Sequence, residues 1–404
     1  MIRNLLISLL YSFLSIFIKR KDNIIAFGSW AGEMYADNSK YLLEYILKNY
    51  PGRFKLYWVG NKSIENSIPQ GVTFLEKDKL STGIILLKAK YFFCTQMHRA
   101  DICKYNVYQG CKIIYLDHGL AIKRWAMDIV NYNGELEEKN IVKRIYHFVT
   151  GESKKYDYFA TSSPLMDKVY CSSLKYRGSS IEKMLQCGIP RNDYLIDNKD
   201  NQEEILRIKD KYSKLLGFDK KKKIVLYVPT YRKIETERKS FASLNSFEEQ
   251  RLVQILKQNN AIILEKGHFV TQKRKNESGA RIEDYIININ IPVDIQELDL
   301  ISDIHITDYS GSFLDFILLD KPVIHYIYDY EYYRDIDTGL YYPIEEYAAG
   351  FYSKESTEVI DEIERLLKHN DRFVERRHKI RNVFLEYEDG TASKRICNKV
   401  LHCN

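Results

Sequence analysis

The chain has 404 residues, with 61 Lys and Arg against 55 Asp and Glu, which gives a net charge of +6 when the histidines are neutral. It is 45% hydrophobic and 29% charged, which excludes disordered, collagen-like and coiled-coil classes, and its length suits two domains better than one core. The weakly basic balance suits phosphate-bearing ligands or an anionic membrane and is too small for a dedicated nucleic-acid binder. The seven cysteines include no C-x-x-C pair, which argues against a disulfide framework or a zinc site and favours a reducing cytoplasm.

Residues 5–18 form an apolar run between Arg3 and the basic triplet 19–21. The run is short for a membrane-spanning helix, which needs about 20 apolar residues. A secretory signal would have a small-residue cleavage site where this chain has the triplet. We favour a helix in the membrane interface, with the triplet against anionic headgroups. A short span, a cleaved signal and a buried first helix are the alternatives. No other segment has 18 consecutive apolar residues, so the body is expected to be soluble.

Strand-like runs alternate with helix-periodic stretches along the rest of the chain, which predicts a parallel α/β fold. Expected strands in the first half are residues 24–27, 54–59, 91–95, 112–116 and 158–161. A helical period follows the first of them, and either Asn38 or Ser39 is its expected cap. Expected strands in the second half are 223–228, 261–264, 304–307 and 323–326. The charged stretch 197–223 predicts a domain boundary near 195–205, with a cleft between two similar halves.

The end of the fourth expected strand carries one possible catalytic cluster. The strand leads into His118 and Gly119, and Lys123 and Arg124 follow. Glycine permits a tight turn, and histidine transfers protons near neutral pH. A histidine after a strand is more often structural, so the cluster alone leaves both interpretations open.

A second cluster follows the expected strand 304–307. Asp308 ends the strand, and Ser310, Gly311 and Ser312 open a helix. Free backbone N–H groups and the helix dipole favour a phosphate at such an end, although plain capping by either serine explains the residues equally well. The segment has neither a Gly-Lys-Ser/Thr sequence nor a G-x-G-x-x-G, which speaks against P-loop and NAD sites.

Three more polar clusters stand at strand ends or near the expected boundary. They are residues 228–233, 264–268 and 188–193. Each has a bland explanation as loop polarity, but five clusters in a two-domain α/β chain together indicate one site. The remaining histidines, His305 among them, are interpreted as structural or surface residues. The sequence has no metal-ligand spacing and no G-x-S-x-G elbow.

Taken together, these segments resemble the CDP-glycerol glycerophosphotransferase family, which primes and polymerises teichoic acids and related capsule polymers. Residues 302–316 are similar to the family's Asp-x-x-Ile-Thr-Asp-Tyr-Ser-Ser segment, and Lys321-Pro322 with the tyrosine-rich run 328–339 are similar to its Lys/Arg-Pro and its Tyr-Asp…Tyr-Arg…Gly run. Residues 227–232 resemble Tyr-Ala-Pro-Thr-Tyr-Arg, 188–193 resemble Gly-x-Pro-Arg-Asn-Asp, and 35–41 resemble Tyr-x-Asp-Asn-Pro-Lys-Tyr. The matches run in order from about residue 24 to 345.

The resemblance implies a GT-B-like fold, in which two Rossmann-like domains face each other across a cleft and the C-terminal one holds the nucleotide. We expect a membrane-associating helix over residues 1–21, an acceptor-side domain over 22–198 and a nucleotide-binding domain over 199–404. It implies that His118 is the base and that His268 is the second essential histidine. Expected donor-binding residues are Pro229, Thr230, Arg232, Lys266, Asp308, Ser310, Gly311, Ser312 and Asp315. Further candidates are Gly119, Lys123, Arg124, Arg191, Asn192 and Asp193.

The chain departs from the family pattern at four places. Asp117 stands where the family commonly has Trp, and Leu120-Ala121 stand where it has Thr-Pro. Gly311 replaces the second Ser of Ser-Ser, and Lys266 replaces the Arg of Arg-x-His. The first two departures concern the acceptor side.

The expected reaction transfers glycerol phosphate from CDP-glycerol to a hydroxyl of a lipid-linked or polymeric acceptor and releases CMP. We expect no tightly bound cofactor and no nucleic-acid partner; a divalent cation is possible but not indicated. The expected location is the cytoplasmic face of the cell membrane, as a peripheral protein. The alternatives are a GT-B glycosyltransferase with a nucleotide sugar, a CDP-ribitol-dependent transferase and a non-catalytic nucleotide-binding scaffold.

Overall fold

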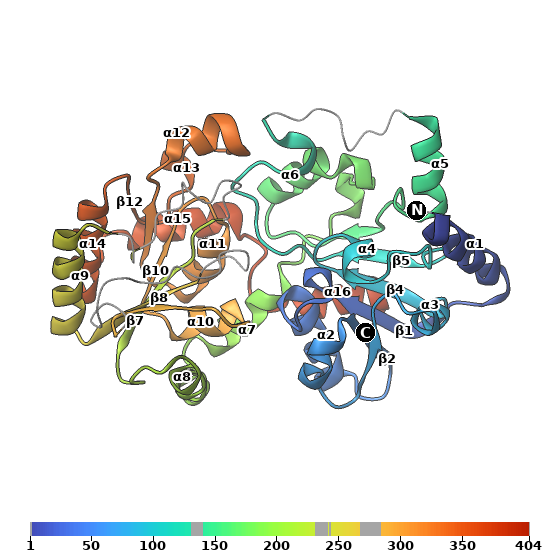
Figure 1. Cartoon of the computed structure of the whole chain (residues 1–404), viewed down its shortest axis with the longest axis horizontal. Helices are drawn as coiled ribbons and strands as arrows, with labels where there is room; N and C mark the ends of the chain where they lie inside the picture. The colour runs from blue at the N-terminus through green and yellow to red at the C-terminus, as the bar shows by residue number, and fades with distance from the viewer. Residues whose placement is uncertain (1, 131–139, 231–240, 242–243, 267–283, 404) are drawn as a thin grey trace.

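A computed structural model of the chain describes residues 2–130, 140–230, 241, 244–266 and 284–403. The chain forms two lobes that lie side by side (Figure 1), and each lobe is built around a six-stranded sheet whose strands pair in parallel. This arrangement confirms the expected pair of Rossmann-like α/β domains.

The sheet of the first lobe contains most of the strands expected from the first half of the sequence. Its strands are β1 (Lys21–Gly28), β2 (Lys55–Gly60), β3 (Val72–Glu76), β4 (Ala89–Cys94), β5 (Lys112–Tyr115) and β6 (Tyr158–Phe159). Their order in the sheet is β3-β2-β1-β4-β5-β6. The buried part of each central strand is apolar, from Ile24 onward in β1, because helices cover both faces of a parallel sheet.

The sheet of the second lobe repeats this order. Its strands are β7 (Lys223–Tyr227), β8 (Ala261–Glu265), β9 (Ile286–Asn288), β10 (Ile304–Thr307), β11 (Val323–Tyr326) and β12 (Phe351–Ser353), arranged as β12-β11-β10-β7-β8-β9. Both sheets are therefore six-stranded, parallel and crossed over in the manner of a Rossmann-type fold.

All nine expected strands are present, and three further strands were missed. The missed strands, β3, β9 and β12, each lie at an edge of a sheet. Two of them have three residues, and β3 buries only Leu75. An edge strand this short, or this exposed, has too weak a hydrophobic pattern to be recognised in the sequence.

In the ranges that the structure describes, six helices belong to the first lobe, and two more connect the first lobe to the second. In chain order they are α1 (Ile2–Phe17), α2 (Asp37–Asn49), α3 (Leu80–Leu86), α4 (His98–Asp101), α5 (Ile141–Val149), α6 (Pro164–Ser173), α7 (Pro190–Asn198) and α8 (Gln202–Leu216). The expected cap of α2 was wrong, because Ala36 is the cap and Asn38 and Ser39 lie in the first turn. Their side chains instead bind the strand ends: the Asn38 amide donates to the carbonyl oxygens of residues 116 and 117, and the Ser39 hydroxyl donates to that of Gly28.

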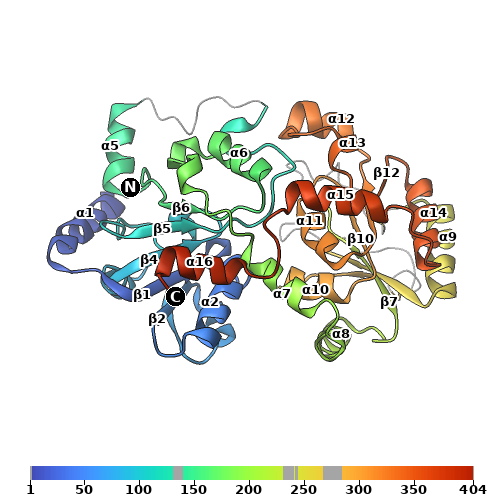
Figure 2. The ribbon, with the colours of Figure 1, turned by 180° about the vertical axis from the view of Figure 1, so that it is seen from behind.

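The helices of the second half are α9 (Ser246–Gln258), α10 (Ile295–Ile301), α11 (Ser312–Phe316), α12 (Tyr330–Tyr332), α13 (Ile344–Tyr347), α14 (Ser356–Leu367), α15 (Val374–Phe384) and α16 (Ala392–Leu401). The last of them crosses back to the first lobe, as Figure 2 shows in red, and packs on α2 and α7. The division at residues 198 and 199 stays a prediction, and α16 is a contact across it.

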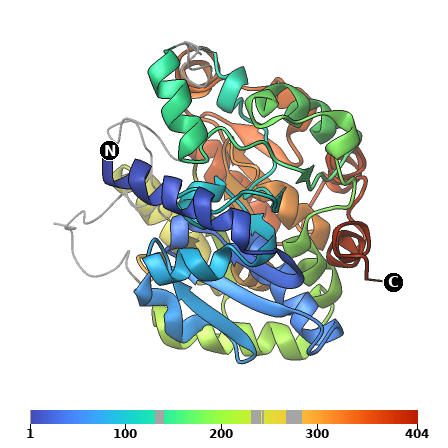
Figure 3. The same ribbon diagram turned by 90° about the vertical axis from the view of Figure 1, so that its right-hand side faces the viewer.

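Helices α1 and α5 lie together at the end of the first lobe that faces away from the second lobe (Figure 3). Only Ser8 and Tyr11 of α1 are buried, so the alternative of a buried first helix is wrong. Within the part of the chain that is described, no helix has the length and apolar character needed to cross a membrane.

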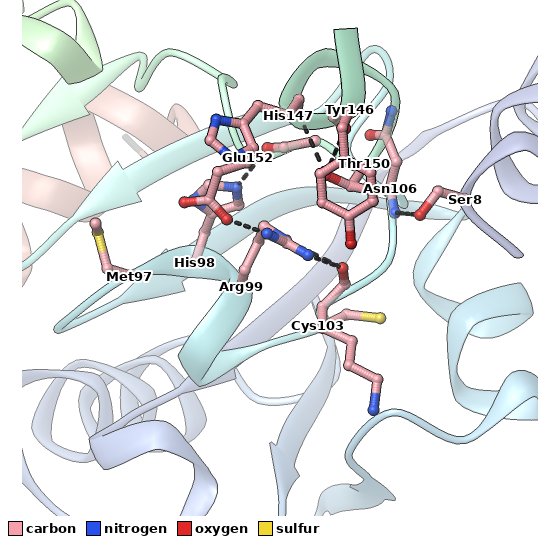
Figure 4. Close-up of polar contacts among 12 residues, drawn as sticks. Ser8, Met97, His98, Arg99, Cys103, Asn106, Tyr146, His147, Thr150 and Glu152 are labelled. Atoms are coloured by element: carbon pink, nitrogen blue, oxygen red, sulfur yellow. Dashed lines mark hydrogen bonds and ion pairs between the residues drawn. The ribbon is translucent and has the colours of Figure 1, made fainter. Parts of the chain in front are cut away.

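A set of polar contacts joins both helices to the segment between β4 and β5 (Figure 4). The Asn106 backbone N–H donates to the Ser8 hydroxyl at 3.2 Å, and its side-chain amide donates to the Val149 carbonyl oxygen at 3.0 Å. Beside them, the ring of His98 lies 3.0 Å from the Gly151 carbonyl oxygen, just after α5. Burial lowers the pKa of His98 to about 3, so this histidine is a neutral structural residue near physiological pH.

Candidate active site

A cavity of about 380 Å³ lies between the two lobes. The first lobe lines it with the segment after β5 and with residues near α2, and the second lobe lines it with residues that follow β7, β8 and β10. The expected residues found in its lining are His118, Gly119, Lys123, Arg191, Pro229, Thr230, Lys266, Ser310, Gly311, Ser312 and Asp315. The segments selected from the sequence therefore do meet at one place, at the carboxyl ends of the strands.

His118 stands in this lining with a partly exposed side chain. Its Nδ1 atom lies 3.2 Å from the carbonyl oxygen of Thr95, and the Thr95 backbone N–H donates to the buried Asp101 carboxylate at 2.9 Å. Because a carbonyl oxygen can only accept, Nδ1 carries the hydrogen and Nε2 keeps a lone pair in the neutral ring. The imidazole is thus fixed in the tautomer that a general base requires.

Asp117 places a buried carboxylate next to this imidazole. Its backbone has a φ of 63°, in the left-handed region that non-glycine residues seldom adopt. The carboxylate accepts from the His118 backbone N–H at 2.7 Å and from the hydroxyls of Tyr115 and Tyr170, and it lies 3.5 Å from His118 Nδ1. These contacts hold both the turn and the carboxylate in place, on the side of the ring that carries the Nδ1 hydrogen.

The wall contributed by the second lobe presents hydroxyl groups. Thr230, Ser310 and Ser312 line the cavity. Asp308 does not; its buried carboxylate accepts from the Thr230 N–H at 2.9 Å and from the Thr230 hydroxyl at 2.5 Å. Asp308 thus orients Thr230 from behind the cavity wall, and its donor-binding role stays a prediction.

Lys266 adds a cation to the same wall, directly after β8. Burial lowers the pKa of its ammonium group, and Asp294, Asp299 and Asp37 oppose that effect. A partly desolvated cation beside several hydroxyls forms a suitable site for a phosphate anion. Lys123 lines the cavity from the other lobe.

The floor of the cavity is a charged bridge between the lobes. Arg191 pairs with Asp37 of α2 and with Asp315 of α11, at 2.7 Å each. Burial raises the pKa of Asp315 to about 6, although Arg191 opposes the shift. A second cross-lobe pair joins Lys40 and Asp294 at 2.7 Å. Both pairs hold the lobes in register around the cavity.

Three further candidates lie outside the lining as the structure describes it. The Arg124 guanidinium donates to the carbonyl oxygen of Leu340. The Asp193 carboxylate caps α16 by accepting from the backbone N–H groups of Ala392 and Ser393, at 2.8 Å each, and Asn192 is buried next to it. Arg124 is exposed, whereas Asn192 and Asp193 face the packed side of their helix; all three connect parts of the fold. Arg232 and His268 lie outside the described residues.

No group of three or more His, Cys, Asp or Glu side chains that could hold a metal ion occurs among the described residues. The cavity lining combines the His118 imidazole of one lobe with the hydroxyl groups and the Lys266 cation of the other.

The sequence was compared with models of known protein families. The model described as "CDP-Glycerol:Poly(glycerophosphate) glycerophosphotransferase" matches residues 10–402. The chain belongs to this family.

Curated relatives agree with that assignment, and a solved structure shares the fold. A teichoic acid glycerol-phosphate transferase of Staphylococcus aureus is 28% identical over 94% of this chain and 92% of its own length. A teichoic acid poly(glycerol phosphate) polymerase of Bacillus spizizenii is 28% identical over 95% and 93%. A structure of the wall teichoic acid polymerase TagF, soaked with CDPG, has a TM-score of 0.79 at 24% identity and covers 97% of this chain and 91% of that one.

Two departures of this chain from the family pattern meet in the cavity. A Cβ atom at Gly311 would lie 1.9 Å from the backbone carbonyl oxygen of Leu120. Gly311 stands where the family commonly has Ser, and Leu120 where it commonly has Thr. The absence of a side chain at 311 therefore lets the loop after His118 approach the second lobe as closely as it does.

Sequence reasoning missed several lining residues, among them Trp30, Gln96, Trp125 and Gln296. The rings of Trp30 and Trp125 lie edge-on to His118, with centroid distances of 6.1 and 6.5 Å. Trp125 follows the His118 cluster closely enough to have been included. Trp30 follows the first strand, and nothing in its local sequence pointed to the site.

Proposed function

We propose that the protein transfers glycerol phosphate from CDP-glycerol to a hydroxyl group of a teichoic-acid-type acceptor and releases CMP. The observation that carries this proposal is the division of the cavity wall: an imidazole with a free Nε2 comes from one lobe, and a cation with several hydroxyls comes from the other. Family membership and the activities named for the relatives support the same reaction.

The reaction proceeds by direct displacement at phosphorus. Nε2 of His118 accepts the proton of the acceptor hydroxyl while the oxygen of that hydroxyl bonds to the β-phosphorus of CDP-glycerol. The bond from that phosphorus to the bridging oxygen breaks, and CMP leaves with the electron pair. The Lys266 ammonium group neutralises part of the charge on the diphosphate, and Ser312 donates to it, since phosphoryl transfer depends mainly on positioning and electrostatic stabilisation.

The acceptor enters from the side of the first lobe. Trp30 and Trp125 flank the base there, together with Met34. Such surfaces pack well against the C–H groups of a polyol or sugar, and Lys123 supplies a charge for an acceptor phosphate. A glycerol phosphate chain or a lipid-linked sugar fits this combination.

A donor screen tests the proposed reaction. The protein is incubated with CDP-glycerol, CDP-ribitol or UDP-sugars, with a lipid-linked disaccharide or a polymer fragment as acceptor. We expect CMP and an acceptor heavier by glycerol phosphate units, both measured by mass spectrometry. UDP release with sugar transfer would identify a glycosyltransferase. Nucleotide binding without turnover of any donor would identify a non-catalytic scaffold.

The proposal includes peripheral binding at the cytoplasmic face of the membrane, where a lipid-linked acceptor is found. Its support is the outer apolar face, which we define as the exposed apolar side chains of α1 and α5. The α1 members are Ile2, Leu6, Leu9, Leu10, Phe13, Ile16 and Phe17, and the α5 members are Ile141, Val142, Ile145 and Phe148. Each is between 47% and 74% exposed, which is unusual for apolar residues grouped on one surface.

The charges beside this face differ from the expectation. Lys21 is exposed and can meet anionic headgroups. Arg20 cannot, because its guanidinium donates to the carbonyl oxygens of Leu86 and Ala89 at 2.7 Å each. The contribution of α5 had not been recognised from the sequence.

Vesicle flotation tests the membrane proposal. The double variant Phe13→Glu, Ile145→Glu places one charge on each helix of the outer apolar face. We expect it to lose binding to phosphatidylglycerol vesicles, because burying a carboxylate in the interface is unfavourable. Phe247→Glu, at an even more exposed position in the second lobe, is the control and should bind like the wild type. Undiminished flotation of the double variant would contradict the proposal.

A further inference from the structure

The interior of the second lobe contains a hydrogen-bonded relay that ends at the cavity. His305, in the middle of β10, is completely buried. Its Nδ1 lies 3.0 Å from Asp299 Oδ1, and its Nε2 lies 3.1 Å from Ser312 Oγ. Asp299 is also buried, whereas Ser312 lines the cavity. The sequence predicted a structural role for His305 because it lies within a strand. That role does not explain its connection to the cavity.

The protonation state of His305 decides what Ser312 can offer to a ligand. The Asp299 carboxylate only accepts, so Nδ1 carries a hydrogen whether the ring is neutral or cationic. In the neutral ring, Nε2 is an acceptor, and the Ser312 hydroxyl donates to it. The serine then presents only lone pairs to the cavity, which repel a phosphate oxygen. In the cationic ring, Nε2 donates to Oγ, and the serine hydrogen is free to point into the cavity.

We propose that binding of the donor diphosphate draws one proton from solvent to Nε2 of His305. The Ser312 hydroxyl then no longer donates its hydrogen to the ring and donates it to the phosphate instead. This inference rests on the proposed function, because it takes CDP-glycerol as the ligand. His305 acts through Ser312 and is therefore a positioning residue.

Charged groups of both signs lie around the ring. Asp299 of α10 is hydrogen-bonded to the ring and favours its cationic form, whereas Arg191 and Lys266, which interact with Asp299, oppose it. The neighbouring histidine on β11, His325, adds no charge, because burial lowers its pKa to about 4. A bound diphosphate adds negative charge beside the cationic groups and so favours uptake of the proton.

Calorimetry of CDP-glycerol binding to the full chain, without acceptor, measures the proton directly. Titrations at pH 7.5 in phosphate, HEPES and Tris, which differ in ionisation enthalpy, give the number of protons taken up. We expect roughly one proton per donor for the wild type. The His305→Gln variant keeps an amide that can bond both neighbours but cannot be protonated. We expect it to take up none and to bind about tenfold more weakly.

Two more variants keep the test independent of folding defects. Ser312→Ala changes a residue at the cavity wall and should also abolish proton uptake and weaken binding. His325→Gln is the matched control: His325 is equally buried in the adjacent strand, but its Nε2 accepts from the Ala349 N–H, away from Ser312. It should keep both proton uptake and affinity.

The outcomes separate this inference from the proposed function. Donor binding by the wild type without proton uptake, or unchanged uptake in both Ser312→Ala and His305→Gln, overturns the relay alone. Failure of the wild type to bind CDP-glycerol overturns the proposed function, and the relay with it.

Discussion

The two lobes share one architecture, yet they contribute opposite chemistry to the cavity. In the first lobe, the strand ends supply an imidazole flanked by indole rings. In the second, the ends of β7, β8 and β10 supply Thr230, Lys266 and Ser310. A Rossmann-like sheet places its strand ends at one edge whatever the residues are. We therefore propose that the residue types at those ends, and not the topology, assign the acceptor to one lobe and the donor to the other.

The strongest test of this division removes the base. His118→Asn should reduce turnover by about 10²–10⁴-fold, the usual contribution of a general base, measured as CMP release in the presence of acceptor. The dissociation constant of this variant for CDP-glycerol, measured by calorimetry, should equal that of the wild type within error, because the donor wall belongs to the other lobe. Near-normal turnover would remove His118 from the mechanism, and a large loss of donor affinity would contradict the separation of roles.

The bridge between the lobes gives the next effect. Arg191→Met leaves Asp37 and Asp315 buried without their cation, which typically costs about 3–5 kcal/mol of unfolding free energy. Urea denaturation measures that loss. Arg207→Met is the control: Arg207 is an exposed residue paired with Glu204, and its loss should cost less than about 1 kcal/mol. If both variants were equally stable, Arg191 would not be what holds the lobes together.

A smaller effect concerns the cation on the donor wall. Lys266→Met should weaken CDP-glycerol binding by about 10- to 100-fold, the worth of one charge-assisted hydrogen bond. Because burial lowers the pKa of Lys266, its charge is present at low pH and is lost as the pH rises, earlier than for an exposed lysine. Donor affinity of the wild type should therefore fall on the alkaline side, whereas Lys266→Arg should keep its affinity there. A pH-independent affinity in the wild type would exclude this role.

The strands and the site segments of both lobes were predictable because they depend on local pattern. Buried parallel strands are continuous apolar runs, and the polar clusters that end them can be read beside them. Eleven lining residues, His118 and Lys266 among them, were identified in this way or through the family resemblance. The resemblance, and not the individual clusters, singled out the reaction.

What could not be predicted depends on partners far apart in the chain. Asp308 and Asp193 stand in the expected segments, but each turns to a backbone or hydroxyl group inside the protein. The role of His305 needs Asp299 and Ser312 on two different helices. An apolar helix such as α5 has the same composition whether its face is buried or exposed. Only the packed structure decides such cases.

The contact between the lobes at Gly311 yields the last effect, which falls on transfer and not on donor binding. A Cβ at this position meets the Leu120 carbonyl oxygen, so any side chain must displace the loop that follows His118. Overpacking of this kind costs about 1–3 kcal/mol, and it should appear as slower transfer with little change in donor affinity, because the donor wall itself is intact. Gly311→Ala and Gly311→Ser should be equally impaired if the Cβ alone is responsible. If the serine variant, which restores the residue common in the family, were fully active while the alanine variant was slow, the hydroxyl would be taking part in donor binding and the two lobes would tolerate a wider separation than this structure shows.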